Sequence, residues 1–263
     1  MFSIEIPYCD LAKIFNGNQT YRWRKISDDK YIVIDGKKIV LIEQKKNRKL
    51  FICSEDDFFD YWFNYFDCDF DYGKTLFTIK NFYKEIKKCN FFYAFVVKDN
   101  RKYRMLKNDL FETMIRFCLD EKGRDEKFER FITTFGEKRV NSLQGLKVTW
   151  FKFPDPEKID VSFNCGLSKE ERIKIKTVSK AINEDLLNKI KNSNEERAYR
   201  YLQKIYNDKQ WIKNVMLYSL GFKDMFYVEE DMKEFLRINK IKPECFTKFN
   251  DVKGFLLQLL KVK

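Results

Sequence analysis

The chain has 263 residues, 44% of them hydrophobic and 17% aromatic, so it is long enough to bury a large core in one or two domains. It has no apolar run near the roughly 20 residues that a membrane-spanning helix needs, and its N-terminus lacks the apolar segment of a signal peptide. We therefore expect a cytoplasmic protein with no membrane partner. The absence of histidine excludes Ser-His-Asp triads and imidazole general bases.

The seven cysteines are scattered singly, without a CxxC pair. This pattern predicts reduced thiols, mostly in the core, of a cytosolic protein. Zinc and iron–sulfur sites need clustered ligands, so we expect no metal and no cofactor. A redox sensor would lack a pairing motif and is the weakest functional hypothesis.

The net charge of +12 is unevenly distributed. Residues 1–100 hold 17 Lys and Arg against 15 Asp and Glu, whereas residues 101–263 hold 35 against 25. A basic second half favours a polyanionic partner, nucleic acid before membrane. An ordinary solvated, lysine-rich surface is the alternative.

The first predicted elements are strands. Residues 31–42 are two β-branched runs joined at Asp35-Gly36, the pattern of a hairpin whose turn needs a positive φ. Residues 50–53 can add a third strand. Residues 54–73 then carry seven acids and no base among interleaved aromatics. This segment is either an acidic binding face or, as we prefer, a short helix and turn whose aromatics pack on the sheet.

Helical spacing begins near residue 105, with apolar side chains at intervals of three and four residues in 110–118 and 128–135. Pro154 and Pro156 interrupt the chain. Asn183 and Asp208 are predicted caps of two later helices. We therefore predict an α+β protein, with an antiparallel sheet domain at residues 1–100 and a helical domain at residues 101–263.

Four segments carry a resemblance to a known family. They are residues 18–24 (Asn-Gln-Thr-Tyr-Arg-Trp-Arg), 61–67 (Tyr-Trp-Phe-Asn-Tyr-Phe-Asp), 153–156 (Phe-Pro-Asp-Pro) and 202–205 (Leu-Gln-Lys-Ile). In order and spacing they resemble the 8-oxoguanine DNA glycosylase/lyase family of helix-hairpin-helix proteins. The resemblance implies base flipping, a lysine nucleophile after the hairpin, and a nearby aspartate.

The chain departs from this family where the chemistry takes place. Residues 205–212 lack both hairpin glycines, and the family lysine falls on Gln210 or on Trp211, depending on the register. Glu229 stands where the resemblance places the aspartate. Lys209, or else Lys213, is the alternative amine, with Glu229 as its partner.

The family's other functional positions differ as well. Asn18 replaces the glycine whose carbonyl senses the oxidised base, and Leu257 replaces the base-contacting glutamine, although Gln258 is adjacent. Residues 119–124 (Leu-Asp-Glu-Lys-Gly-Arg) replace the asparagines that fill the gap left by the flipped base. The hairpin of the helical domain is thus degenerate, and no catalytic residue is assigned apart from the alternative pair Lys209 and Glu229.

The leading hypothesis is an inactive glycosylase-like protein that binds DNA, RNA or a nucleoprotein complex. Arg172, Lys176 and Lys180 share one helix face, as a stripe that can follow phosphates. The composition also suits a phage or mobile-element inhibitor of a host nuclease or CRISPR effector. The alternative is an active glycosylase or AP lyase with altered specificity. The predicted nucleic-acid contacts are Arg101, Lys102, Arg104, Lys122, Arg124, Lys138, Arg139, Arg172, Lys174, Lys176 and Lys180.

Overall fold

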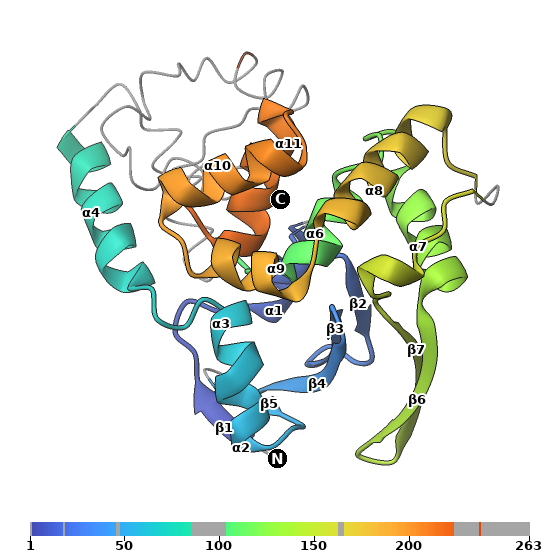
Figure 1. Cartoon of the computed structure of the whole chain (residues 1–263). Helices are drawn as coiled ribbons and strands as arrows, with labels where there is room; N and C mark the ends of the chain where they lie inside the picture. The colour runs from blue at the N-terminus through green and yellow to red at the C-terminus, as the bar shows by residue number, and fades with distance from the viewer. Residues whose placement is uncertain are drawn as a thin grey trace. The chain divides into compact units, whose positions relative to one another are not determined.

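The computed structural model describes residues 2–17, 19–45, 48–85, 104–162, 166–223 and Arg237. The chain forms two compact units that interleave along the sequence (Figure 1). Unit 1 comprises Met1–Thr20, Glu43–Lys107 and Gly221–Lys263, and unit 2 comprises Tyr21–Ile42 and Asn108–Leu220. The division into a sheet domain and a helical domain at residue 100 stays a prediction.

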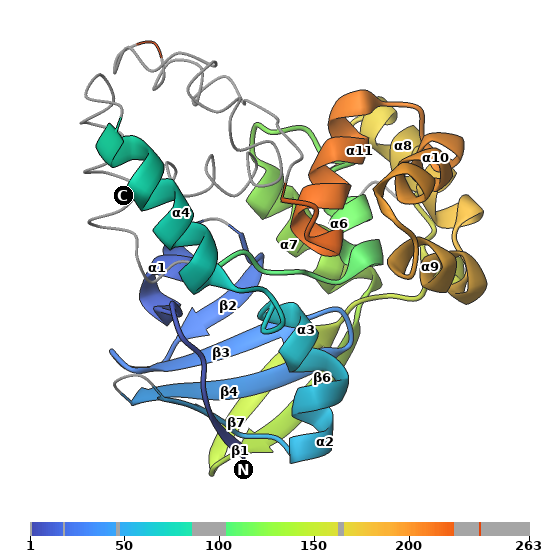
Figure 2. The same cartoon turned by 90° about the vertical axis from the view of Figure 1, so that its left-hand side faces the viewer.

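The N-terminal part of the chain forms the predicted sheet, whose strand order is β1-β5-β4-β3-β2 (Figure 2). The predicted hairpin is confirmed: β3 and β4 flank Gly36, whose φ is 54°. The predicted third strand is β5, which begins two residues earlier than expected. The strands are β1 (Phe2–Glu5), β2 (Arg22–Lys25), β3 (Lys30–Asp35), β4 (Lys38–Lys45) and β5 (Arg48–Phe51).

Aromatic side chains of residues 54–73 pack against β5 in unit 1, as predicted. The Phe58 ring lies 4.7 Å from the Phe51 ring in an edge-on arrangement, and Trp62 and Phe66 are buried. The helices of unit 1 are α1 (Leu11–Asn16), α2 (Glu55–Asp57), the π-helical turn η1 (Phe58–Trp62), α3 (Phe63–Tyr65) and α4 (Tyr72–Glu85).

Unit 2 contains the predicted series of helices, and their caps follow the sequence. The side chains of Asn183 and Asp208 accept the backbone N–H groups of Leu186 and Trp211. Among the described residues, no helix is both long and apolar enough to cross a membrane. The helices are α6 (Leu110–Arg116), α7 (Arg124–Phe135), the 3-10 turn η4 (Pro156–Lys158), α8 (Lys169–Ala181), α9 (Glu184–Lys191), α10 (Glu195–Ile205), α11 (Lys209–Val215) and the π-helical turn η5 (Met216–Leu220).

A second hairpin, which the sequence did not predict, interrupts the helices of unit 2. Strands β6 (Glu137–Leu143) and β7 (Leu146–Lys152) pair antiparallel around Gln144 and Gly145, whose φ angles are 50° and 80°. Two positive φ angles in a two-residue loop match the right-handed twist of the strands. Six of the seven β6 residues are exposed, so β6 lacks the alternation by which strands are predicted.

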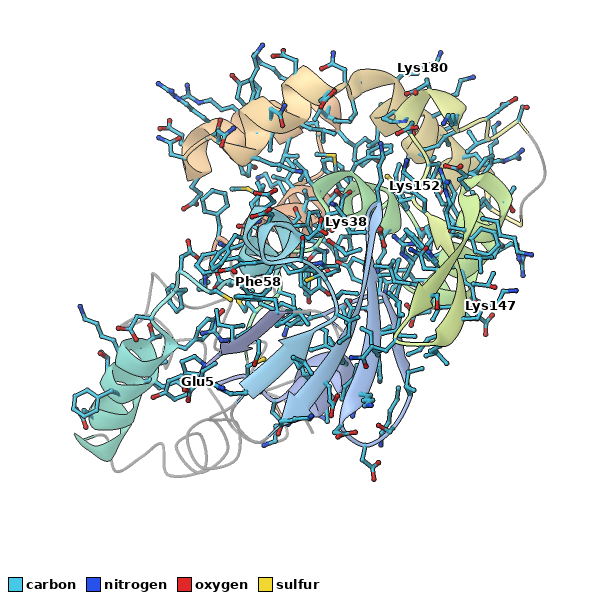
Figure 3. The ribbon with its side chains drawn as sticks, turned by 90° about the horizontal axis from the view of Figure 1, so that it is seen from below. Glu5, Lys38, Phe58, Lys147, Lys152 and Lys180 are labelled. Carbon is cyan, nitrogen blue, oxygen red and sulfur yellow. The ribbon has the colours of Figure 1, made fainter. Side chains whose placement is uncertain are left out.

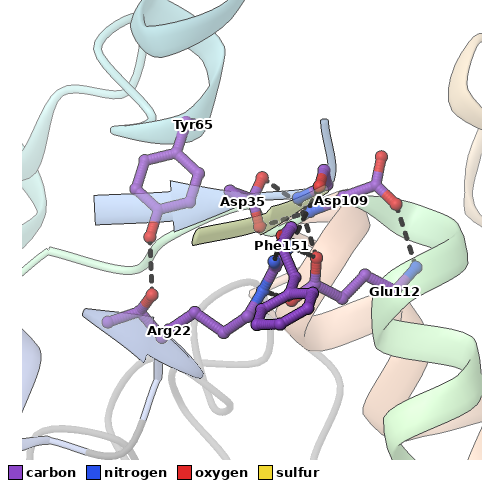
Figure 4. A network of polar contacts seen from close by, with 8 residues as sticks. Arg22, Asp35, Tyr65, Asp109, Glu112 and Phe151 are labelled. Carbon is purple, nitrogen blue, oxygen red and sulfur yellow. Dashed lines mark hydrogen bonds and ion pairs between the residues drawn. The ribbon is translucent and has the colours of Figure 1, made fainter. Parts of the chain in front are cut away.

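A buried ion pair joins four elements of unit 2 (Figure 4). Arg22 on β2 forms a bidentate pair with Glu112 on α6, with Nε to Oε1 at 2.8 Å. The same guanidinium donates to the carbonyl oxygens of Phe151 at 2.6 Å and Gly36 at 3.0 Å. The Glu112 carboxylate also accepts the Gly36 N–H at 2.7 Å, and its side chain is 1% exposed.

The β3–β4 turn is fixed from its other side as well. Both Asp35 carboxylate oxygens accept the N–H of Asp109, at 3.0 and 2.9 Å, and Asp109 caps α6 through the N–H of Glu112. A Cβ on Gly36 would lie 3.0 Å from the Asp109 side chain, so the turn requires glycine for space as well as for its φ. The Phe153 N–H donates to the Gly36 carbonyl at 2.9 Å, which ties the Phe-Pro-x-Pro segment to this turn.

We predict that Arg22→Met lowers the free energy of unfolding by about 3–5 kcal/mol, because it leaves the buried Glu112 carboxylate without its counter-charge. Arg24→Met on the same strand is the matched control, since Arg24 is exposed and its substitution should change stability by less than about 0.5 kcal/mol. Urea denaturation followed by tryptophan fluorescence measures both. Equal losses in the two variants would show that the ion pair is not the main constraint.

Candidate functional site at the α10–α11 turn

Helices α10 and α11 are joined by Tyr206, Asn207 and Asp208 within unit 2. The Tyr206 N–H donates to Leu202 O and the Asp208 N–H to Tyr206 O, each at 2.9 Å. Both helices bury their apolar faces, with Leu202 and Ile205 on one side and Trp211 and Ile212 on the other. This short helix–turn–helix is the segment in which the sequence resemblance predicts the family's hairpin.

Neither candidate position for the family lysine presents an amine. Trp211 is 4% exposed, and its indole Nε1 donates to the Met114 carbonyl at 3.0 Å. Gln210 is exposed and carries a neutral amide. Lys209, the first residue of α11, is exposed, and Lys213 is half-buried one turn later. Trp211 is thus a packing residue, and the nearest available amine is one residue away.

The turn is also poorly suited to hold a phosphate through its backbone. None of residues 206–208 has a positive φ, so the turn lacks the left-handed geometry that hairpin glycines provide. Asp208 accepts the Trp211 N–H at 2.9 Å and places a carboxylate at the start of α11. Because that carboxylate occupies the positive end of the helix, it repels a phosphate from the same N–H groups.

The loop of residues 119–124, where the resemblance predicts the family's gap-filling asparagines, is anchored to α8. The buried Glu171 carboxylate accepts the Asp120 N–H at 2.9 Å and the Lys127 amine at 2.7 Å. The same carboxylate accepts the Ser168 N–H at 2.7 Å and so completes a capping box. Burial would raise the pKa of Glu171, but Lys127 and these N–H donors lower it below its ordinary value.

One predicted nucleic-acid contact is corrected by the structure. Arg104 is 3% exposed, and its guanidinium donates to the carbonyls of Pro7, Phe66 and Asp67 at 2.8 to 2.9 Å. It also lies 4.5 Å from the centre of the Tyr72 ring. Its donors are used inside unit 1, so Arg104 is a structural residue. Sequence position alone does not separate such an arginine from a surface one.

Arg104 belongs to a buried polar cluster that the sequence did not reveal. The Asp67 carboxylate is 1% exposed and lies 2.7 Å from the amines of Lys107 and Lys223, while the Tyr72 hydroxyl donates to it at 2.6 Å. Burial opposes ionisation of Asp67, but Lys223 and Lys107 hold its pKa below its ordinary value. Because Asp67 is paired with two lysines and Arg104 donates to backbone carbonyls, we read this cluster as structural.

The other basic contacts predicted in unit 2 lie at or near its surface. Lys122, Lys138, Arg139, Lys176 and Lys180 are exposed, and Figure 3 shows Lys180 on α8 as well as Lys147 and Lys152 on β7. Their role as nucleic-acid contacts stays a prediction. Arg124, Arg172 and Lys174 are half-buried. Outside the described residues lie Arg101 and Lys102, the proposed partner Glu229, and the altered base-reading positions Asn18, Leu257 and Gln258.

Two cysteines are buried in the part of the chain that the structure describes, and no metal centre is found there. Burial raises the pKa of Cys9 to about 11 and that of Cys118 to about 12, so both stay protonated at neutral pH. No group of three or more Cys, Asp or Glu residues there is arranged to hold a metal ion.

The chain is similar to a known domain and to solved glycosylase structures. Residues 2–114 match the family described as 8-oxoguanine DNA glycosylase, N-terminal domain. No curated protein matches the sequence. The similarity to this family in sequence is therefore confined to residues 2–114.

Three solved structures show that the whole chain shares this fold. Apo 8-oxoguanine glycosylase/lyase of Clostridium acetobutylicum superposes with a TM-score of 0.79 at 20% identity, over 100% of this chain and 97% of that one. MBOgg1 in complex with a low affinity DNA ligand superposes with a TM-score of 0.77 at 22% identity, over 99% of this chain and 93% of that one. The 3-methyladenine DNA-glycosylase of Archaeoglobus fulgidus superposes with a TM-score of 0.68 at 14% identity, over 99% of this chain and 98% of that one.

We predict that Glu171→Gln destabilises the protein by about 1–2 kcal/mol at pH 7, because it weakens three charge-assisted hydrogen bonds. The pKa of Glu171 is lowered in the folded state, so this stability is present above the ordinary glutamate value of 4.5 and is lost as pH falls below it. The difference in the free energy of unfolding between wild type and Glu171→Gln should therefore become smaller as the pH falls below 4.5.

Glu170→Gln is the control, since Glu170 is exposed in the same first turn of α8. Urea denaturation at pH 7 and at pH values below 4.5 measures both variants. A Glu171→Gln penalty that does not depend on pH would contradict an ionised Glu171.

Proposed function

We propose that this protein uses a glycosylase fold to bind DNA and does not excise bases through a lysine nucleophile. The observation that carries the proposal is the α10–α11 turn, where Trp211 is buried and bonded to Met114 and Gln210 offers only an amide. A Schiff base with an abasic sugar requires a free amine, which neither side chain supplies.

The charge distribution and the similar structures support DNA as the partner. The second half of the chain holds 35 basic against 25 acidic residues, and several of these basic side chains are exposed in unit 2. MBOgg1 was solved with a low affinity DNA ligand, and the Clostridium acetobutylicum enzyme with double-stranded DNA containing cytosine opposite 8-oxoguanine. Because the α10–α11 turn is poorly suited to a phosphate, we assign the contacts to exposed basic side chains.

We expect gel-shift titrations to show binding of duplex DNA that weakens steeply as the salt concentration rises, because each neutralised phosphate releases counterions. The double variant Lys122→Gln/Lys138→Gln should reduce the slope of log K against log salt by about two. Single-stranded DNA and RNA probes determine which nucleic acid is preferred. Absence of binding to every probe at low salt would overturn the proposal and favour a protein partner.

A second candidate function is an active lyase that uses Lys209, with Glu229 as its acid–base partner. The exposure of Lys209 at the first position of α11, one residue from the expected register, favours it. A misplacement of about 1 Å can reduce a catalysed rate roughly 10²-fold, so the displacement weighs against efficient turnover.

Borohydride trapping on abasic and 8-oxoguanine duplexes separates the two functions. We expect no covalent adduct with the wild-type protein, because its nearest amine is out of register. An adduct that forms with wild type and with Lys213→Ala, but not with Lys209→Ala, would establish the lyase.

Within the binding hypothesis, a phage or mobile-element inhibitor of a host nuclease or CRISPR effector is the more specialised form. It rests on amino-acid composition and on the altered catalytic positions. Recovery of a nuclease or effector protein in a pull-down that survives nuclease digestion would support it. Loss of every partner on digestion would leave nucleic-acid binding alone.

A further inference from the structure

Helix α8 and the segment 156–162 enclose a groove of about 660 Å³ in unit 2. This volume lies within the range of roughly 300–1,000 Å³ that is usual for small-molecule sites. The groove is separate from the α10–α11 turn, and Lys180 at its border points away from the helix into solvent (Figure 3). It is lined by Pro156, Glu157, Ile159, Asp160, Val161, Ser162, Lys169, Arg172, Ile173, Lys176, Ser179, Lys180 and Ile182.

The groove has an excess of positive charge. Lys169, Arg172, Lys176 and Lys180 line it, against the carboxylates of Glu157 and Asp160. Asp160 is already engaged, because its carboxylate accepts the Ser162 N–H at 3.0 Å. Successive cations from 172 to 180 are four residues apart, a rise of about 6 Å along the helix, which is comparable with the spacing of neighbouring phosphates in a nucleic-acid strand.

Two buried polar atoms of residues that line the groove have no hydrogen-bond partner among the described residues. They are the Arg172 Nε and the Ser179 hydroxyl, and Ser179 is 7% exposed. A buried donor without an acceptor costs about 1–3 kcal/mol, so native proteins rarely leave one unmatched. Both residues line the groove, so a small rotation of either side chain would bring its polar atom to an oxyanion bound there.

The groove also has an apolar wall. Ile159, Val161 and Ile182 line it beside Ile173, which is 56% exposed on the same helix as the cations. An exposed isoleucine next to a row of cations favours a ligand with a flat or apolar body and an anionic group. A nucleobase joined to a phosphate has this combination.

We propose that the groove between α8 and residues 156–162 binds a phosphate ester of the nucleotide type. Arg172, Lys176 and Ser179 hold the phosphate, and Ile173 contacts the base. The ester belongs either to a free nucleotide or to a nucleic-acid strand, and for the strand the inference rests on the proposed DNA binding.

Titration calorimetry at low ionic strength tests the groove with adenosine 5′-monophosphate, adenosine and single-stranded pentathymidylate. We expect both phosphate-containing probes to bind and adenosine not to bind. Tighter binding of pentathymidylate identifies a strand as the source of the phosphate, and equal or tighter binding of the monophosphate identifies a free nucleotide. Methyl NMR signals of Ile159, Ile173 and Ile182 should shift with either probe.

Arg172→Gln/Lys176→Gln should weaken binding by at least about tenfold, since it removes two charge-assisted contacts. Ser179→Ala should weaken binding without loss of stability, because its hydroxyl has no partner among the residues that the structure describes. The control Lys191→Gln/Lys204→Gln removes the same charge from exposed positions on α9 and α10 and should leave the affinity unchanged.

Failure of both phosphate-containing probes to bind, or equal loss in the groove variant and the control, would overturn the proposal. Duplex DNA is titrated separately, so that the two proposals can fail independently. If duplex DNA binds and neither small probe does, the groove proposal is wrong and the DNA-binding proposal stands. If the monophosphate binds and duplex DNA does not, the DNA-binding proposal is wrong and the groove proposal stands.

Discussion

The ion pair between Arg22 and Glu112 is the constraint on which the architecture of unit 2 depends. It joins strand β2 to helix α6 and brings the backbone of the β3–β4 turn and of β7 to the same guanidinium. A carboxylate that is 1% exposed is tolerable only when its charge and its lone pairs are matched, and here Arg22 and Gly36 match them. Because Gly36 also receives the Phe153 N–H, one buried carboxylate fixes the relation of segments that are far apart in the sequence.

At the α10–α11 turn, structural stabilisation and the family's chemistry require different residues. Asp208 caps α11 with its carboxylate, and Trp211 fills the core and donates to Met114. A phosphate-docking hairpin would need open N–H groups and left-handed glycines at the same positions, and a nucleophile would need a lysine there. The residues present stabilise the helix pair, and neither candidate position for the family lysine carries an amine. This conflict is the physical basis for proposing binding in place of turnover.

The positive charge of the chain has two roles that the sequence does not distinguish. In unit 1, Arg104, Lys107 and Lys223 are directed inward and matched by carbonyl oxygens and by Asp67. In unit 2, Lys176 and Lys180 are exposed on α8, beside polar atoms that have no partner among the described residues. A net charge of +12 therefore overstates the surface that attracts a polyanion, and we propose the face of α8 as part of that surface.

The sequence by itself determined the elements whose signals are local. The Asp35-Gly36 turn requires a positive φ, Asn183 and Asp208 cap the helices that follow them, and the aromatics of residues 58–66 pack on β5. The resemblance also predicted that the family's catalytic positions are altered, and this stays a prediction. Only the tertiary structure revealed the β6–β7 hairpin, whose exposed β6 lacks an alternating pattern. The tertiary structure also revealed that the Arg104 side chain is buried, that two lysines pair with Asp67 and that a groove lies beside α8. Burial and hydrogen-bond partners arise from contacts between distant segments, so the sequence alone does not predict them.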